Sequence, residues 1–173
     1  MSTYEPVLFP KMPKKSEKEI KALTKSLYQI FSFRRTIRNF SQTPISEEVI
    51  QNCIKIAAMA PSGANHQPWH FVAISSKTIK MKIRHAAEKE EKKFYSSLNH
   101  DEWLRALEPI GTGPNKLHLE KAPWLIVIFA ERYGIKTDGS TYKNYYVPES
   151  VGIACGFLIS AIHQAGQIGR AHV

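Results

Sequence analysis

The chain has 173 residues, a formal net charge of +9, and 43% hydrophobic residues. This length allows one domain with a sizeable core, and the composition is that of a globular rather than a disordered protein. No apolar run approaches the roughly 18 residues that a membrane helix needs. The polar N-terminus lacks the apolar core of a secretion signal. We therefore expect a cytoplasmic protein without a membrane segment.

The positive charge alone would be compatible with a nucleic-acid-binding protein. However, Lys and Arg are interleaved with Glu, as in the run from Glu88 to Lys93, which is typical of a solvated helix face. A site that attracts an anionic cofactor or substrate is the other explanation. We expect no nucleic-acid partner.

The two cysteines, Cys53 and Cys155, both fall in predicted apolar helix stripes. Neither lies near other Cys or His residues at metal-ligand spacing. We therefore predict core thiols in a reducing compartment, with no metal site; a disulfide or a metal site is the alternative.

The N-terminal half is predicted to be mainly helical. Residues 1–15 contain three prolines and should form an extended arm, after which Ser16 and Glu19 make a capping box that opens a helix. Ser46 starts a second helix, which Pro61 ends. The apolar residues of these two helices recur at helical spacing: Ile20, Leu23, Leu27, Ile30 and Phe31, then Val49, Ile50, Cys53, Ile54 and Ala57. Residues 70–74 read as a strand.

The C-terminal half is predicted to alternate helices, loops and one strand. A third helix begins at Thr78 and reaches the high nineties, a shorter one spans 101–107, and Gly and Pro mark a mobile loop at 109–114. A buried strand at 124–130 and a polar connection at 134–143 follow. The last helix runs from near Pro148 to Gly166, and its Gly152, Gly156 and Ser160 favour close helix packing, within the chain or across a dimer. The order of elements indicates an α+β layered fold with no second domain.

A basic cluster follows the first helix, with Arg34, Arg35, Thr36 and Arg38 within five residues. In an extended segment Arg34, Thr36 and Arg38 point to one side. Guanidinium groups bind phosphate through paired, charge-assisted hydrogen bonds. The cluster therefore indicates a phosphate site, although a solvated basic helix end would explain it about as well.

A second segment, from Ala60 to Trp69, lies between a predicted helix and a predicted strand. It holds two prolines, a glycine and small residues, so it should form a rigid loop with accessible backbone amides. Such a loop can approach a planar ring or an anion closely. A plain structural turn is the alternative.

The order R-R-[ST]-x-R, helix, A-P-S-G-A-x-x-Q/E-P-W, strand resembles the nitroreductase family over about residues 20–166. The resemblance implies an α+β nitroreductase-like fold, with a central, mostly antiparallel sheet flanked by helices, in an FMN-binding domain at 16–166. It implies that Arg34, Arg35, Thr36 and Arg38 hold the FMN phosphate and ribityl end. Ser62 and Gly63 would lie against the isoalloxazine ring. Two subunits share each FMN site in this family, so a homodimer is implied.

The segment that covers the flavin divides the family by substrate. Glu91 and Tyr95, four residues apart in the third predicted helix, share a face, and Lys116 follows in the Gly/Pro-rich loop. From spacing alone, surface residues in and near a charged helix are the other interpretation. With Trp103 and Ala122-Pro123 they resemble the lid of the iodotyrosine deiodinases, which implies that Glu91, Tyr95 and Lys116 bind a free amino acid while the Ala64 N–H meets its phenolate oxygen.

The resemblance thus implies reductive dehalogenation of halotyrosines by reduced FMN, with NAD(P)H or a reductase as electron donor. A general NAD(P)H-dependent nitroreductase or quinone reductase is the alternative within the family. A non-enzymatic flavin- or nucleic-acid-binding protein is suggested by the charge alone.

The chain departs from the family pattern at residues 167–173. These residues do not resemble the expected strand, and they can be encoded by a common sequencing-adapter sequence, so we expect a non-native tail and a missing C-terminal part. The resemblance places a hydroxyl donor to the flavin N5 where Ala171–Val173 stand. It also places a further arginine and a C-terminal arm beyond them, so we expect this polypeptide to bind FMN and dimerise poorly.

Overall fold

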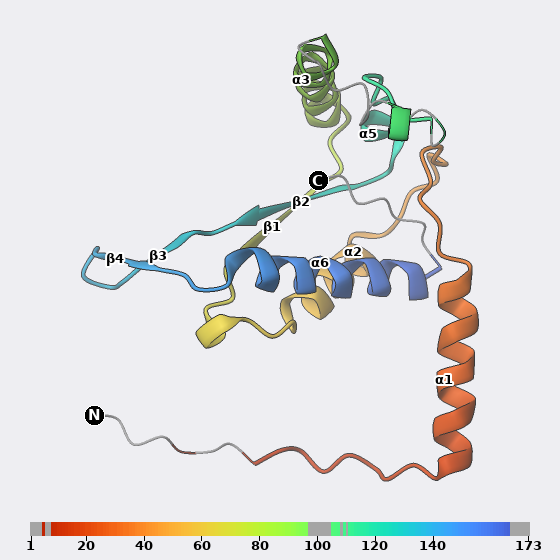
Figure 1. Ribbon diagram of the computed structural model, residues 1–173, viewed down its shortest axis with the longest axis vertical. Coiled ribbons are helices and arrows are strands. Elements are labelled where there is room, and N and C mark those ends of the chain that lie inside the picture. The colour runs from red at the N-terminus through yellow and green to blue at the C-terminus, as the bar shows by residue number, and fades with distance from the viewer. Residues whose placement is uncertain (1–4, 6–7, 97–104, 108, 110, 167–173) are drawn as a thin grey trace. The chain divides into compact units, whose positions relative to one another are not determined.

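Figure 1 shows the computed structural model, which describes residues 5, 8–96, 105–107, 109 and 111–166. The predicted tail at 167–173, Trp103 and most of the predicted helix at 101–107 lie outside these residues, although 105–107 are helical. The chain divides into two units between Arg35 and Thr36, and each is described by itself.

The first unit contains helix α1 (Glu17–Ser32). Its capping box is formed as predicted, because the Ser16 hydroxyl accepts from the Glu19 N–H at 3.3 Å and the Glu19 carboxylate accepts from the Ser16 N–H at 2.7 Å. Most apolar residues of α1 are exposed, including Ile20 at 49% and Leu23 at 47%. Ile20, Leu23 and Leu27 lie on one side of the helix, called here the apolar face of α1.

The core of the second unit lies between α2 (Glu47–Ala58) and α6 (Val147–Gln164). Both helices confirm the sequence prediction, including the buried positions Ile50, Cys53 and Ala57 of α2. Ser46 is the N-cap residue of α2 but makes no side-chain capping bond. Cys53 and Ala57 pack against Leu158 and Ala161 of α6.

The main sheet is an antiparallel pair of strands, β1 (Trp69–Ile74) and β2 (Leu125–Ala130). In their register Trp69 is opposite Ala130 and Ile74 is opposite Leu125. Residues of both strands pack against the α2–α6 core, namely Phe71, Ile126 and Ile128. Helices α2 and α6 lie along one side of this pair in Figure 1. The predicted α+β class is confirmed.

The predicted polar connection at 134–143 is wrong, because the structure places a short hairpin there. Strand β3 (Tyr133–Ile135) pairs antiparallel with β4 (Thr141–Lys143). The turn is closed by the Lys136 N–H, which donates to the Ser140 carbonyl at 2.8 Å, and Gly139 has φ +81°. Asp138-Gly139 between short Tyr-containing runs is a hairpin signal, and it was available in the sequence.

The remaining helices of the second unit are α3 (Lys77–Ser96), η1 (Gly63–Asn65) and α5 (His118–Lys121). Helix α3 begins one residue before the predicted start at Thr78. Among the residues that the structure describes, no helix is both long and apolar enough to cross a membrane. Helix α3 contacts α5, and this contact positions the segment that carries Lys116.

Candidate functional site

The segment Ser62–Gln67, called here the left-handed loop, has an unusual backbone. Three of its non-glycine residues have positive φ: Ala64 at 50°, Asn65 at 55° and Gln67 at 49°. Such conformations cost roughly 1 kcal/mol or more each and persist only where surrounding contacts hold them. Two hydroxyl groups provide such contacts, since the Gln67 N–H donates to Ser62 Oγ at 2.9 Å and the Gly63 N–H donates to Ser150 Oγ at 3.2 Å.

Gly63 is required by close packing against the start of α6. A Cβ atom at this position would lie 2.8 Å from Tyr146 Cδ2 and 2.9 Å from the Tyr145 carbonyl oxygen. Ala64 is exposed, and within the described ranges its backbone N–H donates no hydrogen bond. The Ala64 N–H is therefore available to an acceptor outside the loop, and its predicted contact with a substrate oxygen stays a prediction.

The basic cluster falls on both sides of the unit boundary. Arg34 and Arg35 belong to the first unit, where Arg35 Nη1 donates to the carbonyl oxygens of Ser32 and Arg34 at 2.8 and 2.7 Å. Thr36 and Arg38 belong to the second. The Nε atom of Arg38 is buried, and no atom of the described chain accepts its hydrogen bond. A buried guanidinium N–H without an acceptor is suited to donate to a bound anion.

The substrate residues predicted on α3 and in the Gly/Pro-rich loop are brought together in part. Lys116 Nζ lies 3.0 Å from Glu91 Oε2, and the Lys116 and Glu91 side chains are 4% and 23% exposed. Tyr95 is half-buried one turn after Glu91, and its ring lies edge-on to Phe94 at 6.0 Å. Two opposite charges thus meet in a position largely closed to water.

The contacts divide the predicted residues into two half sites. Residues of the left-handed loop form hydrogen bonds within the loop and to α6. Lys116 instead forms a hydrogen bond and an ion pair with residues of α3. Among the described residues, no hydrogen bond or ion pair joins Ala64 to Lys116.

Three polar residues of α3 bind the lid segment, defined here as residues 112–123. They are Lys80, Arg84 and Glu88, called here the α3 anchor. Glu88 Oε1 accepts from the Lys116 backbone N–H and from Arg84 Nε, both at 2.8 Å. Arg84 Nη1 donates to Glu120 Oε2 at 2.8 Å. The bond from Arg84, followed by that from the Lys116 N–H, holds the pKa of Glu88 below its ordinary value. The sequence analysis missed the anchor. Its residues precede Glu91 at intervals of three or four positions, the spacing of one helix face, and this spacing was visible in the sequence.

Lys80 is the anchor residue nearest the start of α3, and it is 4% exposed. Its ammonium group donates to the carbonyl oxygens of Ala122 and Pro123 at 2.5 and 3.1 Å. Burial lowers the pKa of Lys80, and the nearby positive charge of Lys77 adds to this effect.

Lys80→Met is expected to lower the free energy of unfolding by about 2 kcal/mol, because two carbonyl groups lose their donor while the side-chain volume is kept. Lys77→Met, at an exposed position at the start of α3, is the matched control and should change stability by less than about 0.5 kcal/mol. Urea titrations followed by circular dichroism measure both. Equal effects of the two substitutions would show that the buried ammonium group does not hold the lid segment.

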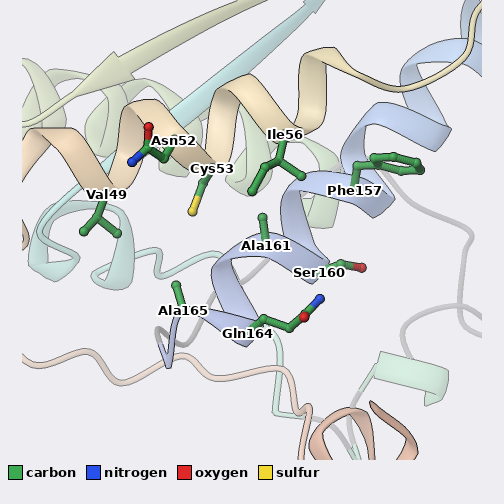
Figure 2. Close-up of a pocket in the computed structure, with 9 residues that line it drawn as sticks. All are labelled: Val49, Asn52, Cys53, Ile56, Phe157, Ser160, Ala161, Gln164 and Ala165. Carbon is green, nitrogen blue, oxygen red and sulfur yellow. The ribbon is translucent and has the colours of Figure 1, made fainter. Parts of the chain in front are cut away.

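An apolar groove of about 650 Å³ lies between α2 and α6 (Figure 2). It is lined by nine residues, namely Val49, Asn52, Cys53, Ile56, Phe157, Ser160, Ala161, Gln164 and Ala165. None of the predicted site residues belongs to it. Cys53 is a free, buried thiol, and burial raises its pKa, which keeps it protonated. The groove therefore has no group suited to nucleophilic chemistry.

Residues 32–167 match the nitroreductase family, so the match covers most of the chain. The chain belongs to the nitroreductase family.

Two curated relatives are iodotyrosine deiodinases. The chain is 54% identical over 145 residues to that of Haliscomenobacter hydrossis, which covers 84% of this chain and 65% of the relative. It is 40% identical over 163 residues to that of Daphnia pulex, which covers 94% of this chain and 54% of the relative. The chain thus spans between about half and two thirds of the length of these relatives.

The chain is also similar to a solved structure, that of oxidized iodotyrosine deiodinase bound to FMN and 3-iodo-L-tyrosine. The TM-score is 0.70 and the sequence identity is 31%. The match covers 81% of this chain and 70% of that chain. The similarity therefore includes much of the fold described above.

Proposed function

We propose that the protein is an FMN-dependent oxidoreductase that removes halide from halotyrosines. The observation that carries this proposal is the Glu91–Lys116 ion pair, in which opposite charges lie 3.0 Å apart and largely buried. A free amino acid presents an ammonium and a carboxylate group, so its site needs an anion and a cation close together. The iodotyrosine deiodinase relatives support the same assignment.

The residues present fit an FMN site. Arg34, Arg35, Thr36 and Arg38 would hold the phosphate and ribityl end, and the unpartnered Nε of Arg38 supports an anion there. Ser62 and Gly63 would lie against the ring system, and the missing Cβ of Gly63 lets this backbone pack against the start of α6. When bound and reduced, FMN would supply the two electrons that, with a proton, replace the carbon–halogen bond by a carbon–hydrogen bond and release halide.

The substrate would be held at its two ends. Glu91 would accept from the ammonium group, Lys116 would pair with the carboxylate, and Tyr95 would hydrogen-bond while packing on the aromatic ring. The free Ala64 N–H would donate to the phenolate oxygen. Because Glu91 and Lys116 pair with each other in this structure, each would exchange one charged partner for another as a zwitterion enters.

We further infer that two copies share the site and that NAD(P)H or a reductase supplies electrons. The exposed apolar face of α1 supports an association between copies. The small residues Gly152 and Gly156 of α6 support it too, because a Cβ at either would meet nothing within 4 Å. A second chain has room to approach this helix closely.

Titration of the protein with 3-iodo-L-tyrosine, in the presence of saturating FMN, tests the proposal. We expect quenching of the flavin fluorescence, and we expect Glu91→Gln and Lys116→Ala each to raise the Kd at least about tenfold by removing a charged partner of the ligand. Glu90→Gln and Lys93→Ala are matched controls, because these residues form an exposed ion pair on α3. Unchanged binding in both site variants would overturn the substrate assignment. Fast nitroaromatic turnover without iodotyrosine binding would favour a general nitroreductase.

A further inference from the structure

We propose that Glu88 is a positioning residue for Lys116. It would hold the Lys116 backbone against α3, so that only the Lys116 side chain moves between Glu91 and a ligand carboxylate. This inference rests on the proposed function for its substrate. Glu88 would touch neither the substrate nor the flavin. Its role would be to fix where the lysine side chain begins.

The contacts place both ends of Lys116 on one face of α3. Glu88 accepts from the Lys116 backbone N–H at 2.8 Å, and Glu91, three residues further on, pairs with the ammonium group at 3.0 Å. Residues three apart on a helix are neighbours on its surface. The same helix face therefore holds the main chain of Lys116 through one carboxylate and its side chain through the next.

The orientation of Glu88 is fixed by a second donor. Arg84 Nε binds the same Oε1 atom as the Lys116 N–H, and Arg84 Nη1 reaches Glu120 on α5. The side chains of Arg84 and Glu88 are only 22% and 14% exposed, so solvent screens this network less than a surface pair. Arg84 thus bridges α3 and α5 on the C-terminal side of Lys116. The backbone that carries the lysine is bound before any ligand arrives.

Such an arrangement lowers the entropy lost when a ligand binds, because the lysine is already near its working position. The benefit applies only to ligands that use the Lys116 ammonium group. A ligand with the same iodinated ring but no amino-acid end should not depend on Glu88. This difference separates a positioning role from a general effect on folding.

The experiment compares wild type, Glu88→Ala and Glu88→Gln in the flavin-loaded protein, with 3-iodo-L-tyrosine and 2-iodophenol as probes. For Glu88→Ala the Kd of iodotyrosine should rise about tenfold, while that of iodophenol should stay within about twofold. Glu88→Gln retains an acceptor for the Lys116 N–H and should recover part of the affinity. Glu90→Gln, a neighbouring exposed glutamate on α3, should behave as wild type. Equal weakening of both probes, or none, would overturn the inference.

Amide hydrogen exchange over residues 112–120 provides a readout that needs no substrate. Glu88→Ala should speed exchange of the Lys116 amide, whereas Glu90→Gln should leave it unchanged. If the wild-type protein bound no iodotyrosine, the proposed function would fail, and exchange would still show whether Glu88 holds the lid segment. If the wild type bound it and Glu88→Ala changed neither exchange nor affinity, the positioning role alone would fail.

Discussion

Replacing Gly63 by alanine is expected to abolish flavin binding and to lower the free energy of unfolding by about 2 kcal/mol or more. The added Cβ would lie 2.8 Å from the Tyr146 side chain and 2.9 Å from the Tyr145 carbonyl oxygen. The carbonyl oxygen belongs to the backbone at the start of α6, so it cannot turn away as a flexible side chain would. The loop would therefore have to move.

Movement of Gly63 would also disturb what its N–H holds. That group donates to the Ser150 hydroxyl, and Ser150 is 2% exposed. A shift would leave the hydroxyl of a buried serine without this donor and would release the neighbouring positive-φ residue Ala64. Flavin binding should be lost because both the ring contact and the Ala64 donor depend on this backbone.

Flavin absorbance after desalting measures cofactor content, and urea titration measures stability. Gly113→Ala is the matched control, since a Cβ at Gly113 meets nothing within 4 Å and its φ is not positive. This control should bind flavin normally and change stability by less than about 0.5 kcal/mol. A Gly63→Ala protein as stable and as yellow as the control would show that the close packing at Gly63 is not needed.

The elements with strong apolar periodicity could be predicted from the sequence. Helices α1, α2 and α6 follow the spacing of their apolar residues, and β1 and β2 are short apolar segments of strand length. The β3–β4 hairpin was missed because its strands have three residues each and expose most of their side chains. Short exposed strands give no periodic signal, so only the turn at Asp138-Gly139 marked this hairpin.

The composition of the candidate site could be predicted, but its geometry could not. Glu91 and Lys116 were named from their pattern, yet their contact joins residues 25 positions apart and depends on how the lid segment packs on α3. The α3 anchor was missed for the same reason, because Arg84 reaches Glu120, 36 residues further along the chain. Residue types indicate which groups can pair, and packing decides which ones do.

The backbone of the left-handed loop was likewise beyond sequence reasoning. Composition indicated a rigid loop, but Ala64, Asn65 and Gln67 adopt positive φ, which non-glycine residues rarely do. A contact 87 residues away, between Gly63 and Ser150, helps to hold this conformation. Strain that a distant contact maintains cannot be read from a local pattern. Its position in the loop where the Ala64 donor is free supports a functional reason for it.

Arg38→Ala is expected to raise the Kd for FMN by about 10- to 100-fold, the loss expected for charge-assisted hydrogen bonds to a phosphate. Arg38 is chosen from the basic cluster because its Nε is buried and no described atom accepts from it, whereas Arg34, Arg35 and Thr36 are exposed. A buried donor without an acceptor gains most when the anion arrives. FMN titration by fluorescence quenching measures the affinity.

Two further variants separate charge from geometry. Arg38→Lys keeps the positive charge but loses the planar, forked donors, so it should recover only part of the affinity. Arg132→Ala removes an arginine at an exposed position outside the basic cluster and should leave FMN binding within about twofold, since an exposed charge is screened by salt. Full affinity in Arg38→Ala would show that the unpartnered Nε does not face the phosphate. A loss equal to that of Arg132→Ala would indicate only the effect of net charge.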